Sequence, residues 1–259
     1  MIKGKIKDLK IDNLQIFETG NKYGNMNTAA AFYPECYNAF DRKGVFLKRR
    51  MMAGEEYGFD GHKMYVANQK DKTGTYFELD RDFVEAYPDG WEADIDEDIL
   101  IVNEKVPKVV IGHPVADCPV VMAYDAKNKA VAIAHCSAEL VDKLMPMSVI
   151  DALSKKYNSK DEDIVTYVSA CAGESWTYDR YPSWAKNEHV WKNAIEESED
   201  KLYHINLKLA VLRELRERNI ENIIMQDVDT ITDDNFYSNS ASRTLEKKKG
   251  RHFAGAFFR

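Results

Sequence analysis

The chain has 259 residues, of which 44% are hydrophobic and 31% charged, and its net charge is −7. This composition is typical of a globular protein, and the negative charge argues against broad nucleic-acid binding, which needs a basic surface. No stretch approaches the roughly 20 apolar residues of a membrane-spanning helix, and the N-terminus lacks the apolar run of a secretory signal, so we expect a cytoplasmic protein that binds no membrane.

Strand and helix patterns follow one another without a linker or an internal repeat, which predicts a single domain over residues 1–259. The first part of the chain predicts one or two strands within 2–17, a loop over 21–38, a helix over 42–57 and short strands over 64–67 and 75–79. Four apolar, β-branched segments in the centre predict buried strands over 99–103, 106–111, 119–124 and 130–134.

The second half combines helices with single strands. Helices are predicted over 140–157, 188–200 and 206–218, and strands over 163–170, 220–225 and 252–258. Pro146 must lie in the first turn of its helix or kink it, because proline has no amide hydrogen to donate. Together the elements predict an α+β fold, with mixed β-sheets or a β-sandwich flanked by helices.

The four cysteines lack both a CxxC motif and the spacing of a disulfide framework. They are Cys36, Cys118, Cys136 and Cys171. In a chain of this size we expect free thiols, which leaves a catalytic or metal-binding role open for them.

The clearest chemical signal is a thiol and an imidazole at the same end of a predicted hairpin. The turn-forming residues 125–129 join two apolar strands. With the turn centred near Lys127, Cys118 is expected opposite Cys136 and beside His135. A slip of one residue would place Cys118 opposite His135 itself. Both registers bring the thiol and the imidazole together near the edge of the sheet.

The residues alone leave three interpretations of this pair open. Thiolate and neutral imidazole are good zinc ligands, and a catalytic zinc needs three protein ligands and one open position. Alternatively, His135 lowers the pKa of the Cys118 thiol and acts as its base, as in a cysteine hydrolase. The third interpretation is a buried thiol beside a core histidine, without a chemical role.

The stretch around Cys118 resembles the core signature of the laccase-domain family, whose members are also described as polyphenol oxidoreductase-like and as purine nucleoside phosphorylases. Members have the segment T-A-D-C-x-P, an Asp-containing turn and then A-x-x-H-A-G-W. The resemblance runs from about residue 40 to the end of the chain. The similar positions are Ala116-Asp117-Cys118, Asp125, 132–135, Gln69 of a Q-V-H motif, Ala93-Asp94, and the C-terminal segments 229–230, 236–238 and 250–251.

The resemblance implies a metal-dependent enzyme that processes purine nucleosides, by phosphorolysis or by deamination of adenosine-type nucleosides. It implies zinc or copper as the cofactor, and a purine nucleoside and phosphate as the small-molecule partners. Cys118 and His135 match two of the family's metal ligands. Asp71 stands where the third ligand, the His of Q-V-H, is expected. A carboxylate also ligates zinc, and His62 and His113 are alternative third ligands.

Further candidate site residues come from the residues themselves and from the resemblance. Asp117 either orients His135 by a hydrogen bond, which would give it a catalytic role, or caps a turn. Gln69, Arg243 and Arg251 are expected to bind substrate, and a guanidinium offers a forked pair of donors to phosphate.

The chain departs from the family pattern at several positions, which indicates a divergent member. Residues 136–139 replace the A-G-W-R arm, so Glu139 reverses the charge of an arginine, and 169–173 departs from G-P-x-I-G. These departures leave two alternative functions open: a metal-free hydrolase that uses Cys118 and His135, or a pseudoenzyme that binds nucleosides without turnover. An aromatic cluster either stacks on a purine or packs internally; it comprises Trp176, Tyr178, Tyr181, Trp184 and Trp191.

Overall fold

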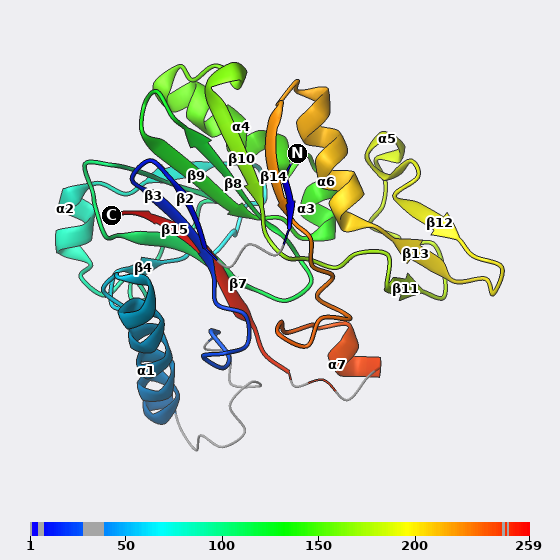
Figure 1. Cartoon of the computed structure of the whole chain (residues 1–259), viewed down its shortest axis with the longest axis horizontal. Coiled ribbons are helices and arrows are strands. Elements are labelled where there is room, and N and C mark those ends of the chain that lie inside the picture. Colours follow the sequence, from blue (N-terminus) through cyan, green and yellow to red (C-terminus); the bar gives the residue numbers. More distant parts are fainter. Residues whose placement is uncertain (1, 5–7, 28–38, 245–246, 248) are drawn as a thin grey trace.

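The computed structural model describes residues 2–4, 8–27, 39–244, 247 and 249–259, which form a mixed α+β architecture (Figure 1). Fifteen strands of this part form three sheets, and seven α-helices accompany them. The predicted α+β fold with mixed sheets is confirmed. Cys36 and the 28–38 part of the predicted loop lie outside the described residues.

The largest sheet has seven strands and mixes parallel with antiparallel pairs. Its order is β1 (Ile2–Gly4), β14 (Asn222–Gln226), β10 (Ile164–Val168), β8 (Val120–Asp125), β9 (Ala130–His135), β6 (Ile99–Asn103) and β5 (Tyr76–Glu78). Alternate residues of β8 and β9 face opposite sides, and both sides are buried. Val121 and Ala132 belong to the core formed with α4 (Met145–Tyr157) and α6 (Leu207–Glu217), whereas Met122 and Ile133 face the second sheet.

The second sheet has five strands and encloses the other half of the core. Its order is β2 (Asp8–Ile11), β3 (Leu14–Glu18), β15 (His252–Phe258), β7 (Val110–Val115) and β4 (Met64–Tyr65). Ile111 and Ala256 on its inner face pack with residues of the seven-stranded sheet. Phe17 and Phe257 on its outer face belong to a hydrophobic cluster that also contains Ala53 of α1 (Ala39–Tyr57). His113 and His135 each follow by two residues the inner-face residues Ile111 and Ile133, so they share that face and both imidazoles lie between the two sheets.

A small third sheet extends at the right of the view in Figure 1, beyond α6. It contains β11 (Trp176–Tyr178), β13 (Tyr203–Ile205) and β12 (Ile195–Glu197). The four remaining helices of the described residues are short: α2 (Arg81–Ala86), α3 (Ala138–Asp142), α5 (Glu188–Trp191) and α7 (Ala241–Thr244). None of the helices in the described ranges is both long and apolar enough to cross a membrane.

Three predicted elements differ from the structure because of local turns. The segment 2–17 forms three strands, since Asp12, with a φ of 53°, turns the chain between β2 and β3. The strand predicted over 106–111 instead forms β7, which begins at Val110 and continues to Val115. The helix predicted over 140–157 is broken at Leu144, whose φ is 63°. Pro146 lies in the first turn of α4, as expected.

The helix predicted over 188–200 stops after Trp191 and is followed by a strand. Asn193 has a φ of 58°, a left-handed conformation that cannot continue a right-handed helix. The next residues form β12, which pairs with β13. Pairing with β13, the next strand along the chain, outweighs the local helix propensity here. The other predicted helices and strands are present.

Candidate functional site

The hairpin of β8 and β9 has a different register from the two that the sequence suggested. Val120 pairs with His135, so the predictions that placed Cys118 opposite Cys136 or opposite His135 are wrong. The reason is that the turn comprises four residues, 126–129, which moves the pairing by one position. Cys118 lies in the connection from β7 to β8, at the end of the hairpin that also holds His135.

Asp117 fixes the connection that contains Cys118. Its φ of 78° is left-handed, a conformation that aspartate tolerates better than most residues. Its carboxylate accepts hydrogen bonds from the hydroxyl of Thr230 at 2.9 Å and from the amide of Ser240 at 2.7 Å. Its carbonyl oxygen accepts a third bond, at 2.7 Å, from the amide of Ala172. These contacts match the turn-holding interpretation of Asp117, and the carboxylate makes none with His135.

Gln69 holds the imidazole of His135 at two points. The Oε1 atom of Gln69 lies 2.9 Å from Nδ1 of His135, and its Nε2 donates to the His135 carbonyl at 2.9 Å. Because an amide oxygen only accepts, Nδ1 bears the proton and Nε2 keeps its lone pair. Burial, with Arg251 and Lys72 nearby, lowers the pKa of His135 to about 4, so the ring is neutral at pH 7. Gln69 thus orients His135 through hydrogen bonds, whereas the sequence predicted that it binds substrate.

His113 lies on the facing sheet, with its ring centroid 6.0 Å from that of His135. The residue is 3% exposed, and its Nε2 atom has no hydrogen-bond partner among the described residues. Burial, together with His135, lowers its pKa to about 3. The site therefore holds a second neutral imidazole with an unused nitrogen.

Cys118 is a free, partly exposed thiol. Burial of its sulfur and the neighbouring Asp117 carboxylate raise its pKa to about 12, and the nearby Arg251 only partly opposes this. Without another cation, the residue is therefore a thiol and not a thiolate at neutral pH. A reactive cysteine nucleophile needs the opposite shift.

Arg251 and Tyr178 lie within electrostatic range of this thiol, and Arg243 lies within range of both of them. The Arg251 guanidinium interacts electrostatically with Cys118 and Asp117, and burial lowers its pKa. Arg243, exposed on α7, interacts with Arg251 and with Tyr178 of β11. Tyr178 is itself within electrostatic range of Cys118. The structure therefore brings Arg251, which is far from Cys118 in the sequence, within electrostatic range of the thiol, and Arg243 is connected to it only through Arg251 and Tyr178.

Most of the predicted aromatic cluster packs internally. Trp176 stacks on Trp184 with centroids 5.9 Å apart, and Trp184 contacts Trp191 edge-on at 4.9 Å. Tyr181 instead packs against Tyr203. Tyr178 also packs against Trp176, with centroids 5.4 Å apart, and it is the member within electrostatic range of Cys118 and Arg243.

Two of the predicted third ligands lie elsewhere. Asp71 is exposed at a surface hollow beside Thr73, and Nδ1 of His62 lies 3.5 Å from the Asp89 carboxylate. In the described part of the chain, no three His, Cys, Asp or Glu side chains are placed together as a metal-ligand set. The metal ligands Asp71, Cys118 and His135 therefore stay a prediction, and His113 is the alternative that lies beside His135.

Glu139, which reverses the charge of the family's arginine, is exposed at the surface. Its carboxylate pairs with Lys72 at 3.4 Å and with Lys143 at 3.5 Å. The same Lys72 lowers the pKa of His135. A lysine thus supplies a positive charge near the site, although the arginine of the family arm is missing.

The family model described as multi-copper polyphenol oxidoreductase laccase matches residues 35–259. The chain belongs to this family. The resemblance predicted from the A-D-C and His motifs is confirmed, and the family description is that of an enzyme. The match covers Cys118, His135 and both arginines of the site. No curated protein matches the sequence.

Three solved structures share the fold of this laccase-domain protein. A hypothetical protein YfiH from Bacillus licheniformis has a TM-score of 0.73 and 18% identity over 95% of this chain and 93% of its own. YlmD from Geobacillus stearothermophilus has a TM-score of 0.75 and 13% identity over 96% and 93%. A DUF152 protein from Neisseria meningitidis has a TM-score of 0.70 and 16% identity over 98% and 99%. At these identities the likeness establishes the fold alone.

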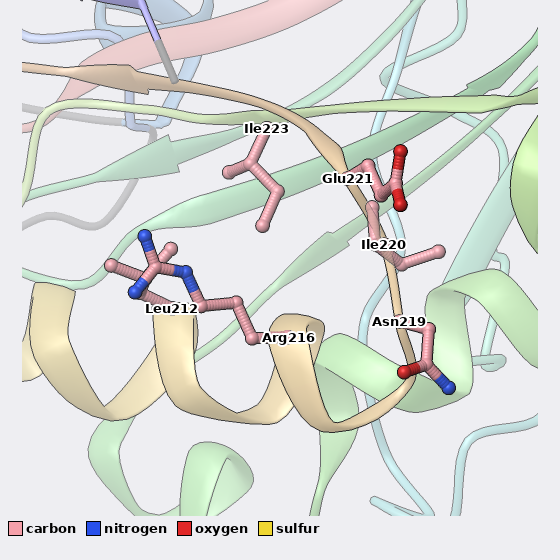
Figure 2. Close-up of a pocket in the computed structure, with 6 residues that line it drawn as sticks. All are labelled: Leu212, Arg216, Asn219, Ile220, Glu221 and Ile223. Carbon is pink, nitrogen blue, oxygen red and sulfur yellow. The ribbon is translucent and has the colours of Figure 1, made fainter.

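A hollow of about 400 Å³ between α6 and β14 is separate from the site of this laccase-domain protein. Figure 2 shows Leu212 and Arg216 projecting from the helix towards Ile223 of the strand. None of the six lining residues is a histidine or a cysteine. The hollow therefore lacks the residues expected for a metal or a thiol nucleophile.

Proposed function

We propose that this laccase-domain protein is a metal-dependent enzyme that processes purine nucleosides, by phosphorolysis or by deamination of adenosine-type nucleosides. The observation that supports it best is the pair of facing imidazoles. The hydrogen bond from Nδ1 of His135 to Gln69 fixes the tautomer whose lone pair is on Nε2. Nε2 of buried His113 lacks a partner among the described residues. A buried polar atom without a partner is costly, and a bound ligand would satisfy it.

Cys118, His135 and His113 would hold the metal. Thiolate sulfur and imidazole nitrogen suit both zinc and copper. His113 replaces Asp71 in this proposal, because His113 faces His135 whereas Asp71 is exposed. When bound, the metal would act as a Lewis acid and would favour the ionised form of Cys118.

The other residues would bind and position the substrate. Arg243 and Arg251 offer guanidinium donors to a phosphate or to ribose oxygens. Tyr178, which lies within electrostatic range of Cys118 and Arg243, would offer an aromatic face to the purine. Gln69 would keep His135 in one orientation and one tautomer through its two hydrogen bonds.

The state of Cys118 weighs against the metal-free hydrolase. A thiol whose pKa burial raises to about 12 is almost entirely protonated at pH 7. The neighbouring imidazoles are neutral and do not offset this. A nucleoside-binding pseudoenzyme would bind nucleosides as the enzyme does, and only a turnover assay distinguishes the two.

The test is an assay of the purified full chain with adenosine and inosine, with and without phosphate, before and after chelation. We expect release of free base or conversion of adenosine to inosine, which chelation abolishes and added zinc or copper restores. Unchanged activity after complete removal of metal would favour the metal-free hydrolase. Saturable binding of adenosine without product would favour the pseudoenzyme, and neither binding nor product would contradict the proposal.

A further inference from the structure

A second cavity lies apart from the Cys118 site, where β3, the C-terminal end of α1 and the segment after β14 meet. Its volume is about 340 Å³, which is within the range of small-molecule sites. Its walls include the rings of Tyr57 and Phe236 and the side chain of Val228. None of the residues assigned above to the metal or the nucleoside lines it.

The cavity contains a buried carboxyl group, that of Glu18. The residue is 6% exposed. Its Oε1 accepts hydrogen bonds from the Tyr167 hydroxyl at 2.6 Å and from Nε2 of Gln226 at 3.4 Å, and the amide of Ala170 is 3.1 Å from both carboxyl oxygens. Among the described residues that amide is the one donor to Oε2, although a carboxylate oxygen accepts two bonds.

No basic side chain among the described residues pairs with Glu18. Its three hydrogen-bond donors satisfy its oxygens in part, but an ionised carboxylate buried without a cation remains unfavourable. The one basic residue that lines the cavity, Lys22, pairs with Glu56 at the rim. The remaining acidic side chain in the lining is Asp233. With its three carboxyl groups ionised, the lining carries a formal charge of −2.

We propose that this cavity binds a small organic cation, an amidinium or ammonium group on a flat apolar body, with the Glu18 carboxylate as its counter-charge. The aromatic walls would contact the apolar body and also attract the cation through their ring faces. Burial raises the pKa of Glu18 to about 7, so the carboxyl group ionises readily when a cation arrives. This inference does not depend on the proposed nucleoside chemistry.

Benzamidine is the probe for this proposal, because it combines an amidinium with one aromatic ring. We expect calorimetry at pH 7.5 to show saturable binding of one benzamidine per chain. Glu18→Gln keeps the shape of the side chain and should weaken binding at least tenfold. Glu55→Gln, at an exposed neighbour of the cavity, removes the same charge and should bind as the wild type does.

Two controls separate this cavity from the Cys118 site. Benzamide, the neutral analogue, should not bind, and Cys118→Ala should bind benzamidine with unchanged affinity even though it loses nucleoside turnover. The proposal is overturned if folded wild-type protein binds no benzamidine, if Glu18→Gln binds it equally well, or if binding disappears with Cys118→Ala. A Glu18→Gln protein that fails to fold is replaced by Phe236→Leu, which removes an aromatic wall and should weaken binding several-fold; unchanged binding there contradicts the proposal.

Discussion

His113 and His135 face each other from different sheets, with their ring centroids 6.0 Å apart. Burial keeps both rings neutral, because it lowers the pKa of His113 to about 3 and that of His135 to about 4. Neutral imidazole is the form that ligates metals. The pair therefore offers two nitrogen donors to the proposed metal, although the family's Q-V-H histidine is absent from the sequence.

Gln69→Ala tests the orientation of His135. The substitution removes both hydrogen bonds that hold the ring, so metal affinity and activity should each fall roughly 10- to 100-fold, while the protein stays folded. Metal titration and nucleoside assays measure the two effects. Asn68→Ala is the matched control, because Asn68 donates to the exposed Asp94 and does not contact the ring. An unchanged metal affinity in Gln69→Ala would count against the assigned role.

The Cys118 thiol should react slowly in metal-free protein. With a pKa of about 12, its alkylation by iodoacetamide at pH 8 should be far slower than that of a free thiol with a pKa near 8.5, and it should accelerate as the pH rises above 9. Mass spectrometry of the peptide that contains Cys118 follows the reaction. Fast alkylation near pH 7 would instead indicate an activated nucleophile.

Asp117 should contribute to stability more than to proton transfer. Asp117→Ala removes two hydrogen bonds from Thr230 and Ser240 and leaves a left-handed backbone that alanine disfavours, so the free energy of unfolding should fall by about 2 kcal/mol. Asp117→Asn keeps an acceptor and tolerates this φ, so it should lose less. Urea unfolding measures both. Equal stability of Asp117→Ala and wild type would show that these bonds are not needed.

The free energy of unfolding should depend on pH because Glu214 lies on the buried face of α6. Burial raises its pKa in the folded state to about 9, from an ordinary value of 4.5. The folded protein therefore holds a proton that the unfolded chain releases, and the free energy of unfolding falls as the pH rises from 4.5 to about 9. At pH 7 this lowers it by about 3 kcal/mol.

Glu214→Gln should remove most of that loss. The variant should be more stable than the wild type at pH 8, and the difference should shrink towards pH 5, as measured by urea unfolding at each pH. The exposed Glu221→Gln serves as the control and should follow the wild type. A variant that is less stable than the wild type at pH 8 would show that Glu214 is ionised and paired in the folded protein.

Local patterns were sufficient for much of the fold. The apolar runs of β8, β9 and β15 and the amphipathic pattern of α6 have the periodicity of their elements, so they were predicted close to their observed bounds. The helix predicted beyond Trp191 was wrong because this segment instead pairs with β13 in a hairpin, and the pairing outweighs its helix propensity.

The site was harder to predict, because its geometry depends on contacts between distant segments. The strand of His113 was predicted to end at Ile111, since Gly112 and Pro114 are unfavourable strand residues. Both fit β7 for structural reasons. At Gly112 the backbone of Ala254 is so close that a side chain would overlap it. Pro114 lacks an amide hydrogen, and β4 does not extend along β7 as far as this residue. The resemblance predicted Cys118 and His135, whereas the positions of His113 and Asp71 relative to them required the packing of the two sheets.

Elemental analysis of untagged protein tests the central claim most directly, beside His113→Ala, His135→Ala and Asp71→Ala variants. We predict close to one zinc or copper per chain in the wild type and in Asp71→Ala, and its loss from both histidine variants. Metal-free wild-type protein that also fails to bind added zinc or copper would contradict the account. Metal that is retained in His113→Ala but lost from Asp71→Ala would instead indicate that Asp71, at the position of the family's Q-V-H histidine, is the third ligand.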